Sequence, residues 1–242
     1  MKQGEIRNIQ GSSKGRCKIT FIMDSIFALT GRKVRWTTEN GEINKWAMLS
    51  TSEQLKAHPF YERLKNDINN VKIKEVTSLF YRGINYKNAP SKLNMGPPPR
   101  EKAKSNRYSS NGEIVLYLSD SPFGVLKECN FENGKTLWCQ EYKIPQNLKI
   151  ANLSYVEPDT FLSCIMWHAD LSEEDDEKRG ENYNYPKYVF SQTIAEIFKN
   201  KYDGIYVFGV RSDDTQYYHN LVIFEPDKKW DSWLENEPMK LL

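Results

Sequence analysis

Short apolar segments separated by polar turns run through the chain from about residue 76 onward, and most of them alternate with the period of two that is typical of strands. KTLWCQEYKI alternates in this way and stops before Pro145, and YDGIYVFGV contains a turn at Asp203–Gly204. The segments that predict strands are VTSLFYRG (76–83), EIVLYLS (113–119), KTLWCQEYKI (135–144), YDGIYVFGV (202–210) and NLVIFEP (220–226). Short helices fall between these strands without a regular strand–helix–strand order. The pattern therefore favours an α+β fold with a mixed sheet core and flanking short helices.

Three segments carry the signals of short helices. Ser121–Pro122 provides an N-cap and a proline in the first turn, and the helix that follows carries Glu128. SQTIAEIFKNK (191–201) has apolar positions at helical spacing. Upstream, Ser50–Glu53 has the spacing of a capping box, and Pro59 interrupts the stripe behind it. The members of that stripe are Leu55, Phe60, Tyr61, Leu64 and Ile68.

The predicted organisation is an accessory N-terminal segment over 1–75, mixed in structure, and a main domain over 76–242. Residues 17–29 begin like a strand and then become ambiguous. In the main domain, residues 88–112 are polar and rich in Pro, Lys and Asn, and a stretch of this length predicts a binding loop or a lid. The acidic run at 170–184 predicts a solvated surface loop, with binding of a metal ion or a basic partner as the alternative.

Composition narrows the class of protein. The 242 residues are 39% hydrophobic and 27% charged, which is typical of a globular protein. Lys and Arg number 34 against 32 for Asp and Glu, which argues against a general nucleic-acid binder. No apolar run is long enough to cross a membrane and no apolar leader follows the N-terminus, so we expect a soluble cytoplasmic protein. Four cysteines lie far apart, which indicates reduced thiols at Cys17, Cys129, Cys139 and Cys164.

The sequence lacks common metal and nucleotide motifs. His58, His168 and His219 are scattered, and Cys164 with His168 is only an i, i+4 pair, so no metal site is expected. The glycine patterns of Rossmann folds and P-loops do not occur, and neither does the GxSxG of α/β hydrolases. Zinc-dependent chemistry and the familiar hydrolase reactions therefore have little support.

Four residues between 80 and 130 form the strongest candidate set for chemistry. Arg82 ends a strand and Arg107 ends the basic loop, and a guanidinium binds phosphate through two charge-assisted hydrogen bonds. Tyr117 offers a flat face to a base or a cationic pyridinium ring, and Glu128 can stabilise an oxocarbenium-like transition state. Such a set suits cleavage of a nicotinamide–ribose bond, whose leaving group departs neutral. From residue types alone, surface charges, a core tyrosine and an exposed helix position are the alternatives.

The order and spacing of these residues resemble the RES domain, a family named for its Arg, Glu and Ser positions and found in bacterial toxin–antitoxin pairs. Arg107 follows Arg82 after 25 residues, Tyr117 follows after 10 more and Glu128 after another 11. The matching segments are FYRG (80–83), MGPPPREKAKSNRYSSNGEIVLYLSDSPFGVLKE (95–128), YVFSQTIAEIFKNKYDGIYV (188–207) and NLVIF (220–224). They extend over roughly 79–226, which is more than half of the chain.

The resemblance implies an ADP-ribosyltransferase-like fold over 76–242 and an enzyme that consumes NAD+. Several family members degrade NAD+ by phosphorolysis to nicotinamide and ADP-ribose-1″-phosphate, and others transfer ADP-ribose to a protein. NAD+ is therefore the expected substrate and inorganic phosphate the expected co-substrate, with no further cofactor. Transfer of ADP-ribose to a protein is the alternative reaction. The implied biological role is a growth-inhibiting toxin. Its implied partner is an Xre-like antitoxin that blocks the site and through which oligomers can form.

The resemblance also assigns roles by position in the matching motifs. Arg82 and Arg107 are expected to bind the dinucleotide or the attacking phosphate. Tyr117 is expected to flank the nicotinamide ribose, and Glu128 to stabilise the ribosyl cation. Tyr81, beside Arg82, is a further candidate for the pocket.

One position departs from the family pattern. The family's serine is expected near position 209, where this sequence has Gly209, whose backbone N–H is a candidate phosphate contact. Ser212 lies three residues later and would serve only if the loop shifted. Ser191 is expected to cap its helix, with a contact in the cofactor pocket as the alternative. Without the family serine, a binding module that keeps the pocket but has lost its chemistry is a third interpretation.

Overall fold

The computed structural model describes residues 56, 61–76, 79–129, 134–156, 162, 188–209, 211–212, 216–226 and 230–241. They belong to two compact units, one within 1–70 and 156–197 and the other within 71–155 and 198–242. All candidate site residues except Ser191 lie in the second unit. The domain boundary at 75/76 remains a prediction, and the predictions for 17–29, 50–53 and 170–184 fall outside the described residues.

The first unit contains α4 (Tyr61–Asn69) and most of α7 (Val189–Lys199). α4 buries Leu64 and Ile68, because residues four apart lie on the same face of a helix. The structure therefore confirms the predicted helical stripe from Tyr61 onward. No helix within the described ranges is long and apolar enough to cross a membrane.

α7 begins two residues before the predicted start at Ser191. Ser191 thus lies within the first turn, and its Oγ donates a hydrogen bond to the backbone carbonyl of Tyr188 at 3.2 Å. A cap would instead lie ahead of the helix and accept from its N–H groups. The prediction that Ser191 caps this helix is therefore wrong, because Val189 and Phe190 already extend the helix ahead of it.

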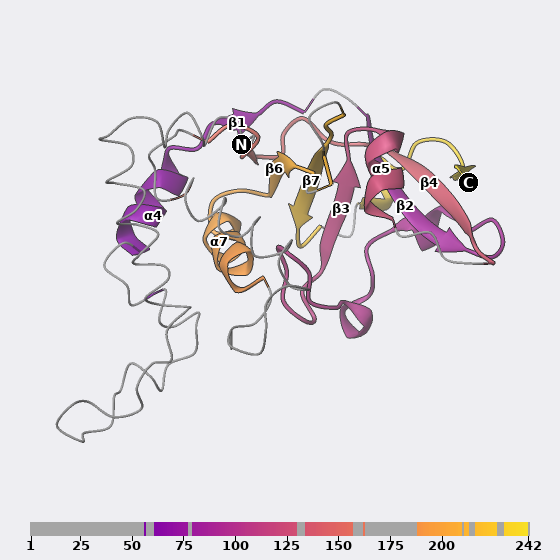
Figure 1. Ribbon diagram of the computed structural model, residues 1–242, viewed down its shortest axis with the longest axis horizontal. Coiled ribbons are helices and arrows are strands. Elements are labelled where there is room, and N and C mark those ends of the chain that lie inside the picture. The colour runs from indigo at the N-terminus through magenta and orange to yellow at the C-terminus, as the bar shows by residue number, and fades with distance from the viewer. Residues whose placement is uncertain are drawn as a thin grey trace, which may run out of the picture. The chain divides into compact units, whose positions relative to one another are not determined.

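The second unit is built on an eight-stranded sheet with the order β1-β5-β6-β7-β3-β2-β4-β8 (Figure 1). The strands are β1 (Ile73–Lys74), β2 (Leu79–Tyr86), β3 (Val115–Ser119), β4 (Thr136–Lys143), β5 (Ile150–Asn152), β6 (Gly204–Phe208), β7 (His219–Phe224) and β8 (Met239–Lys240). Neighbouring strands are antiparallel except β5 and β6, which are parallel. The mixed sheet and the short helices confirm the predicted α+β class.

The predicted strands are present with shifted ends. β2 starts at Leu79 instead of Val76 and continues to Tyr86, because it pairs with β4 along its whole length. The strands without a sequence prediction are β1, β5 and β8, which are two or three residues long. Each of them depends on pairing with a strand that is distant in the sequence.

Apolar clusters cover both faces of this sheet. The buried members of the larger cluster include Phe80, Leu116, Tyr142, Leu221 and Trp233. On the other face, α5 (Pro122–Glu128) lies against β2 and β3, and its Val125 packs with Leu137 and Cys139 (Figure 1). Side chains alternate along β2, so Tyr81 shares the α5 face and Arg82 belongs to the opposite one.

The polar stretch at 88–112 contains two short 3-10 helices, η2 (Lys92–Met95) and η3 (Arg100–Lys102). Met95 is fully buried, and its carbonyl accepts a hydrogen bond from the Tyr142 hydroxyl at 2.8 Å. This part of the stretch is therefore packed on the sheet. Its role as a binding loop or a lid remains a prediction.

α5 begins as the Ser121–Pro122 pattern predicts. The Oγ of Ser121 accepts a hydrogen bond from the Gly124 backbone N–H at 3.2 Å. We expect Ser121→Ala to lower the free energy of unfolding by about 1 kcal/mol, because the acceptor is lost. Chemical denaturation measures this loss, and Ser121→Asp, which retains an acceptor, should recover most of it. An equal loss in both variants would contradict the capping role.

Candidate functional site

Glu128 ends α5, and its carboxylate faces the start of β7. Its Oε1 accepts hydrogen bonds from the Tyr218 hydroxyl at 2.6 Å and from the Asn220 side-chain amide at 2.7 Å. No described residue donates a hydrogen bond to Oε2. Within the described residues, the carboxylate is therefore held through Oε1.

Two glycines make room for the ring of Tyr218. A Cβ at Gly124 would lie 2.6 Å from Tyr218 Cδ2, and a Cβ at Gly209 would lie 2.5 Å from the same atom and closer still to Cε2. Phe123 contacts the ring edge-on, with the centroids 6.2 Å apart. A side chain at Gly209 would displace the ring, and with it the hydroxyl that meets Glu128. A Cβ at Gly124 would also meet the Ser119 Oγ, which lies closer still.

Ser212 holds the backbone of Tyr218. Its Oγ accepts from the Tyr218 N–H at 3.2 Å and donates to the Tyr218 carbonyl at 3.3 Å. The backbone N–H of Gly209 donates to the same carbonyl at 2.9 Å. The serine that follows the family position thus supports the tyrosine that holds Glu128, and Gly209 provides the space for that tyrosine.

Arg211 brings a positive charge to the same end of α5. Its Nη1 donates to the backbone carbonyls of Lys127 at 2.7 Å and Glu128 at 3.3 Å, where a helix leaves its last carbonyls without partners. Its backbone N–H donates to the Tyr218 hydroxyl at 3.3 Å. Burial raises the pKa of Tyr218, and the Glu128 carboxylate raises it further, so the hydroxyl stays protonated as a donor to Glu128.

Arg82 lies where β2 and β3 separate. The two strands pair at Tyr81 opposite Ser119, and next to this pair the Arg82 Nη1 donates to the Tyr117 carbonyl at 3.2 Å. The Nε of Arg82 is buried and has no hydrogen-bond partner among the described residues. Burial also lowers the pKa of this guanidinium. An acceptor oxygen of a ligand would satisfy the buried Nε and stabilise the charge.

Tyr117 connects Arg82 with Arg107. The Tyr117 hydroxyl accepts from the Tyr108 backbone N–H at 3.0 Å, and the Arg107 guanidinium lies 5.4 Å from the centroid of the Tyr108 ring. Burial is the main cause that raises the pKa of Tyr117, and the charge of Arg107 is among the groups that lower it. The carbonyl of Tyr117 therefore contacts one predicted arginine, and its side chain lies within electrostatic reach of the other.

Cys129 lies close to the charged groups of the site. Burial raises the pKa of its thiol, the charges of Arg82 and Arg211 oppose that change, and the charge of Glu128 adds to it. All three charged groups are therefore within electrostatic reach of a single thiol. Arg211 and Glu128 meet at the end of α5, and the residue after Arg82 lies beside Cys129, because a Cβ at Gly83 would be 2.8 Å from its Sγ.

Two predicted residues form no hydrogen bond with the side chain of Arg82 or Glu128 in the described part of the chain. Tyr81 packs against the apolar cluster that includes Val125 and Cys139, on the α5 face of the sheet. Ser191 belongs to the first unit, where its hydroxyl is bonded to Tyr188. Their roles in binding a dinucleotide remain predictions.

Tyr218, Asn220 and Arg211 are site residues that were not predicted from the sequence. A signal for the first two exists in the alternation at β7, which places Tyr218 and Asn220 on the same side of the chain as buried Val222. Polar residues on the buried side of a strand need a hydrogen-bond partner or a ligand. Arg211 lies beyond the end of β6 and carries no comparable signal.

The arrangement combines one carboxylate with several guanidinium groups. In the part of the chain that the structure describes, no group of three His, Cys, Asp or Glu side chains could hold a metal ion. Cys164 and His168 lie outside that part. Guanidinium groups bind phosphates, and a fixed carboxylate stabilises a positive charge that develops beside it. The site is therefore suited to an anionic ligand that becomes cationic at one carbon during reaction.

The sequence matches no family model and no curated protein. Among solved structures, one similar chain comes from a crystal structure of the M. tuberculosis MbcT–MbcA toxin–antitoxin complex. That similarity has a TM-score of 0.46 and 14% sequence identity, and it covers 74% of this chain and 92% of that chain. At this level of similarity, the function of this chain has to be inferred from its own residues.

Proposed function

We propose that this chain cleaves the bond between nicotinamide and ribose in NAD+, with Glu128 as the catalytic residue. The observation that carries the proposal is the Glu128 carboxylate, which is held at Oε1 by Tyr218 and Asn220 and accepts no hydrogen bond at Oε2 from a described residue. A carboxylate that is fixed in this way can stabilise the positive charge that develops at the anomeric carbon. The spacing of Arg82, Arg107, Tyr117 and Glu128, which resembles that of RES domains, supports the same reaction.

The arginines suit the rest of the substrate. NAD+ carries a pyrophosphate, and a guanidinium binds phosphate oxygens through charge-assisted hydrogen bonds. Arg82 has a buried Nε that a phosphate oxygen would satisfy, and Arg107 lies near the same tyrosine, Tyr117. The positive charge of Arg211 at the end of α5 adds to the attraction for an anionic ligand.

We further propose that inorganic phosphate is the acceptor. The C–N bond breaks with its electron pair going to the nicotinamide ring nitrogen, so the leaving group departs neutral and needs no general acid. An oxygen of phosphate then forms the new bond to the anomeric carbon, which yields ADP-ribose-1″-phosphate. Loss of cellular NAD+ by this route would arrest growth, and the resemblance to RES domains supports a toxin held in check by an Xre-like antitoxin.

The test is turnover of NAD+ by the purified full chain, with and without inorganic phosphate and with products identified by mass spectrometry. We expect ADP-ribose-1″-phosphate only when phosphate is present. Nicotinamide should be released without phosphate only if water can act as the acceptor. Free ADP-ribose in both buffers would show that the acceptor is water and not phosphate. An ADP-ribose increment on a protein, without free product, would support the transferase alternative. Absence of both turnover and NAD+ binding would overturn the proposal.

A further inference from the structure

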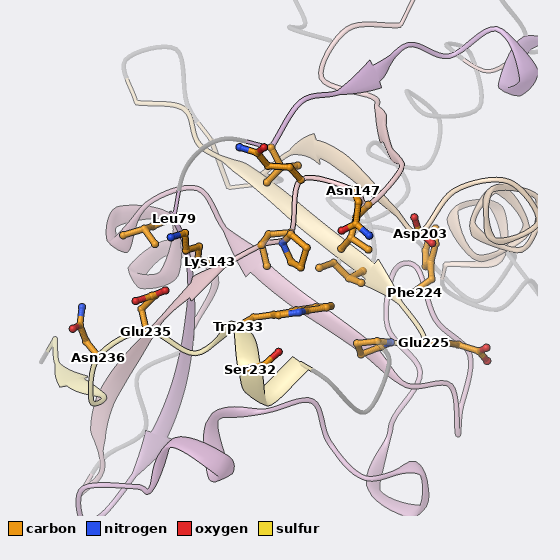
Figure 2. A pocket seen from close by; sticks show the side chains of 17 residues that line it. Leu79, Lys143, Asn147, Asp203, Phe224, Glu225, Ser232, Trp233, Glu235 and Asn236 are labelled. Atoms are coloured by element: carbon orange, nitrogen blue, oxygen red, sulfur yellow. The ribbon is translucent and has the colours of Figure 1, made fainter.

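A groove of about 990 Å³ opens in the second unit (Figure 2). It lies on the face of the sheet opposite α5. Ile144, Ile223 and Trp233 line it, and all three belong to the larger apolar cluster on that face. Neither Arg82 nor Glu128 lines this groove. It is therefore separate from the site proposed for NAD+.

The charged side chains along this groove are mostly acidic. Among the described residues that line it, Asp203, Glu225 and Glu235 are acidic and Lys143 is basic. Figure 2 shows Glu235 on one side of Trp233, and Asp203 and Glu225 on the other. Lys143 lies near Glu235, so the end with Asp203 and Glu225 is the one where the described side chains attract positive charge.

The walls suit an extended chain better than a compact ion. Asn147 lines the groove and offers an amide donor and acceptor of the kind that bind a peptide backbone, while the Asn236 amide donates to Glu141 Oε2 at 2.6 Å. Trp233 lies between the two ends and provides an aromatic surface for aliphatic or cationic side chains. The Oδ2 of Asp203 accepts from the Lys149 backbone N–H at 2.7 Å, which fixes that carboxylate at the rim.

We propose that this groove binds an extended basic segment of a partner protein. A cationic side chain of the segment lies at Asp203 and Glu225, and the chain continues from there across Trp233 towards Glu235. The interaction is independent of NAD+ cleavage, because the groove contains none of the residues placed in that reaction.

The probes are acetylated and amidated peptides of about eight residues with Lys or Arg at two positions, three to five residues apart. Calorimetry with the full chain at about 50 mM NaCl measures their affinity. We expect binding that weakens as the salt concentration rises, and no binding of the same peptides with Gln at both basic positions. Glu225→Gln combined with Glu235→Gln should weaken binding tenfold or more, since both carboxylates face the groove.

The matched control is Glu62→Gln combined with Glu101→Gln, which removes two exposed carboxylates outside the groove and should bind as the wild type does. Glu128→Gln should also keep full peptide affinity, so failure of the proposed NAD+ reaction would not affect this result. Equal affinity of the wild type and the Glu225→Gln, Glu235→Gln variant would overturn the proposal. It would also be overturned if no basic peptide bound at about 1 mM, or if spermidine bound as tightly as the peptides.

Discussion

Glu128→Gln is expected to lower the rate of NAD+ turnover by about a hundredfold to a thousandfold while the chain stays folded. The amide keeps an oxygen that can accept from Tyr218 and Asn220, so the packing around the end of α5 is retained. What disappears is the negative charge beside the anomeric carbon, which stabilises the transition state more than the ground state. Steady-state rates from mass spectrometry, thermal unfolding and growth of cells that express the variant measure the effect.

Tyr218→Phe tests how the positioning of the Glu128 carboxylate affects catalysis while its charge is kept. The variant keeps the ring between its two glycines but removes the 2.6 Å hydrogen bond to Oε1. We expect kcat to fall about tenfold with little change in KM, because a hydrogen bond to a charged group contributes about 1.5–3 kcal/mol. Tyr217→Phe is the matched control, since Tyr217 is 61% exposed, and it should leave kcat unchanged. Wild-type turnover by Glu128→Gln would contradict the assignment of Glu128, whatever Tyr218→Phe does.

Local signals in the sequence predicted α5 and most of the sheet. Ser121 and Pro122 act within a single turn, so the start of that helix depends on few other residues. β3 and β6 are apolar over most of their length and are buried, and their burial can be read from the sequence. β1 and β5 have only two or three residues each, and their strand state comes from pairing with each other and with β6. No local pattern could have predicted them.

In the candidate site too, residues in local motifs could be predicted from the sequence, and partners brought in by strand pairing could not. Arg82 and Glu128 belong to motifs that can be recognised locally, and the structure places both near Cys129. Tyr218 and Asn220, the partners of Glu128, are 90 and 92 residues away from it in the sequence. Their contact with Glu128 depends on β7 pairing with β3, the strand that leads into α5. Since strand order is a property of the whole sheet, sequence reasoning could identify the carboxylate but not the groups that hold it.

Gly209→Ser places the residue type expected from RES domains at this position, and we expect it to damage the protein. The new Cβ would overlap the Tyr218 ring, with Cδ2 only 2.5 Å away, so the ring has to move. Overpacking of this kind costs about 1–3 kcal/mol and should lower the melting temperature by roughly 5 °C. Turnover should fall about tenfold as well, because the displaced hydroxyl no longer donates to Glu128.

A double-mutant cycle with Tyr218→Ala tests the cause. Removing the ring creates space, so Gly209→Ser should cost much less free energy of unfolding in the Tyr218→Ala background than in the wild type. The three heavy atoms nearest to that Cβ all belong to the Tyr218 ring. An equal loss of unfolding free energy in both backgrounds would therefore mean that the strain arises elsewhere. Faster turnover by Gly209→Ser would show that a serine here contacts NAD+ directly. The expected loss would instead mean that this chain uses a glycine at 209 so that Tyr218 can hold the carboxylate of Glu128.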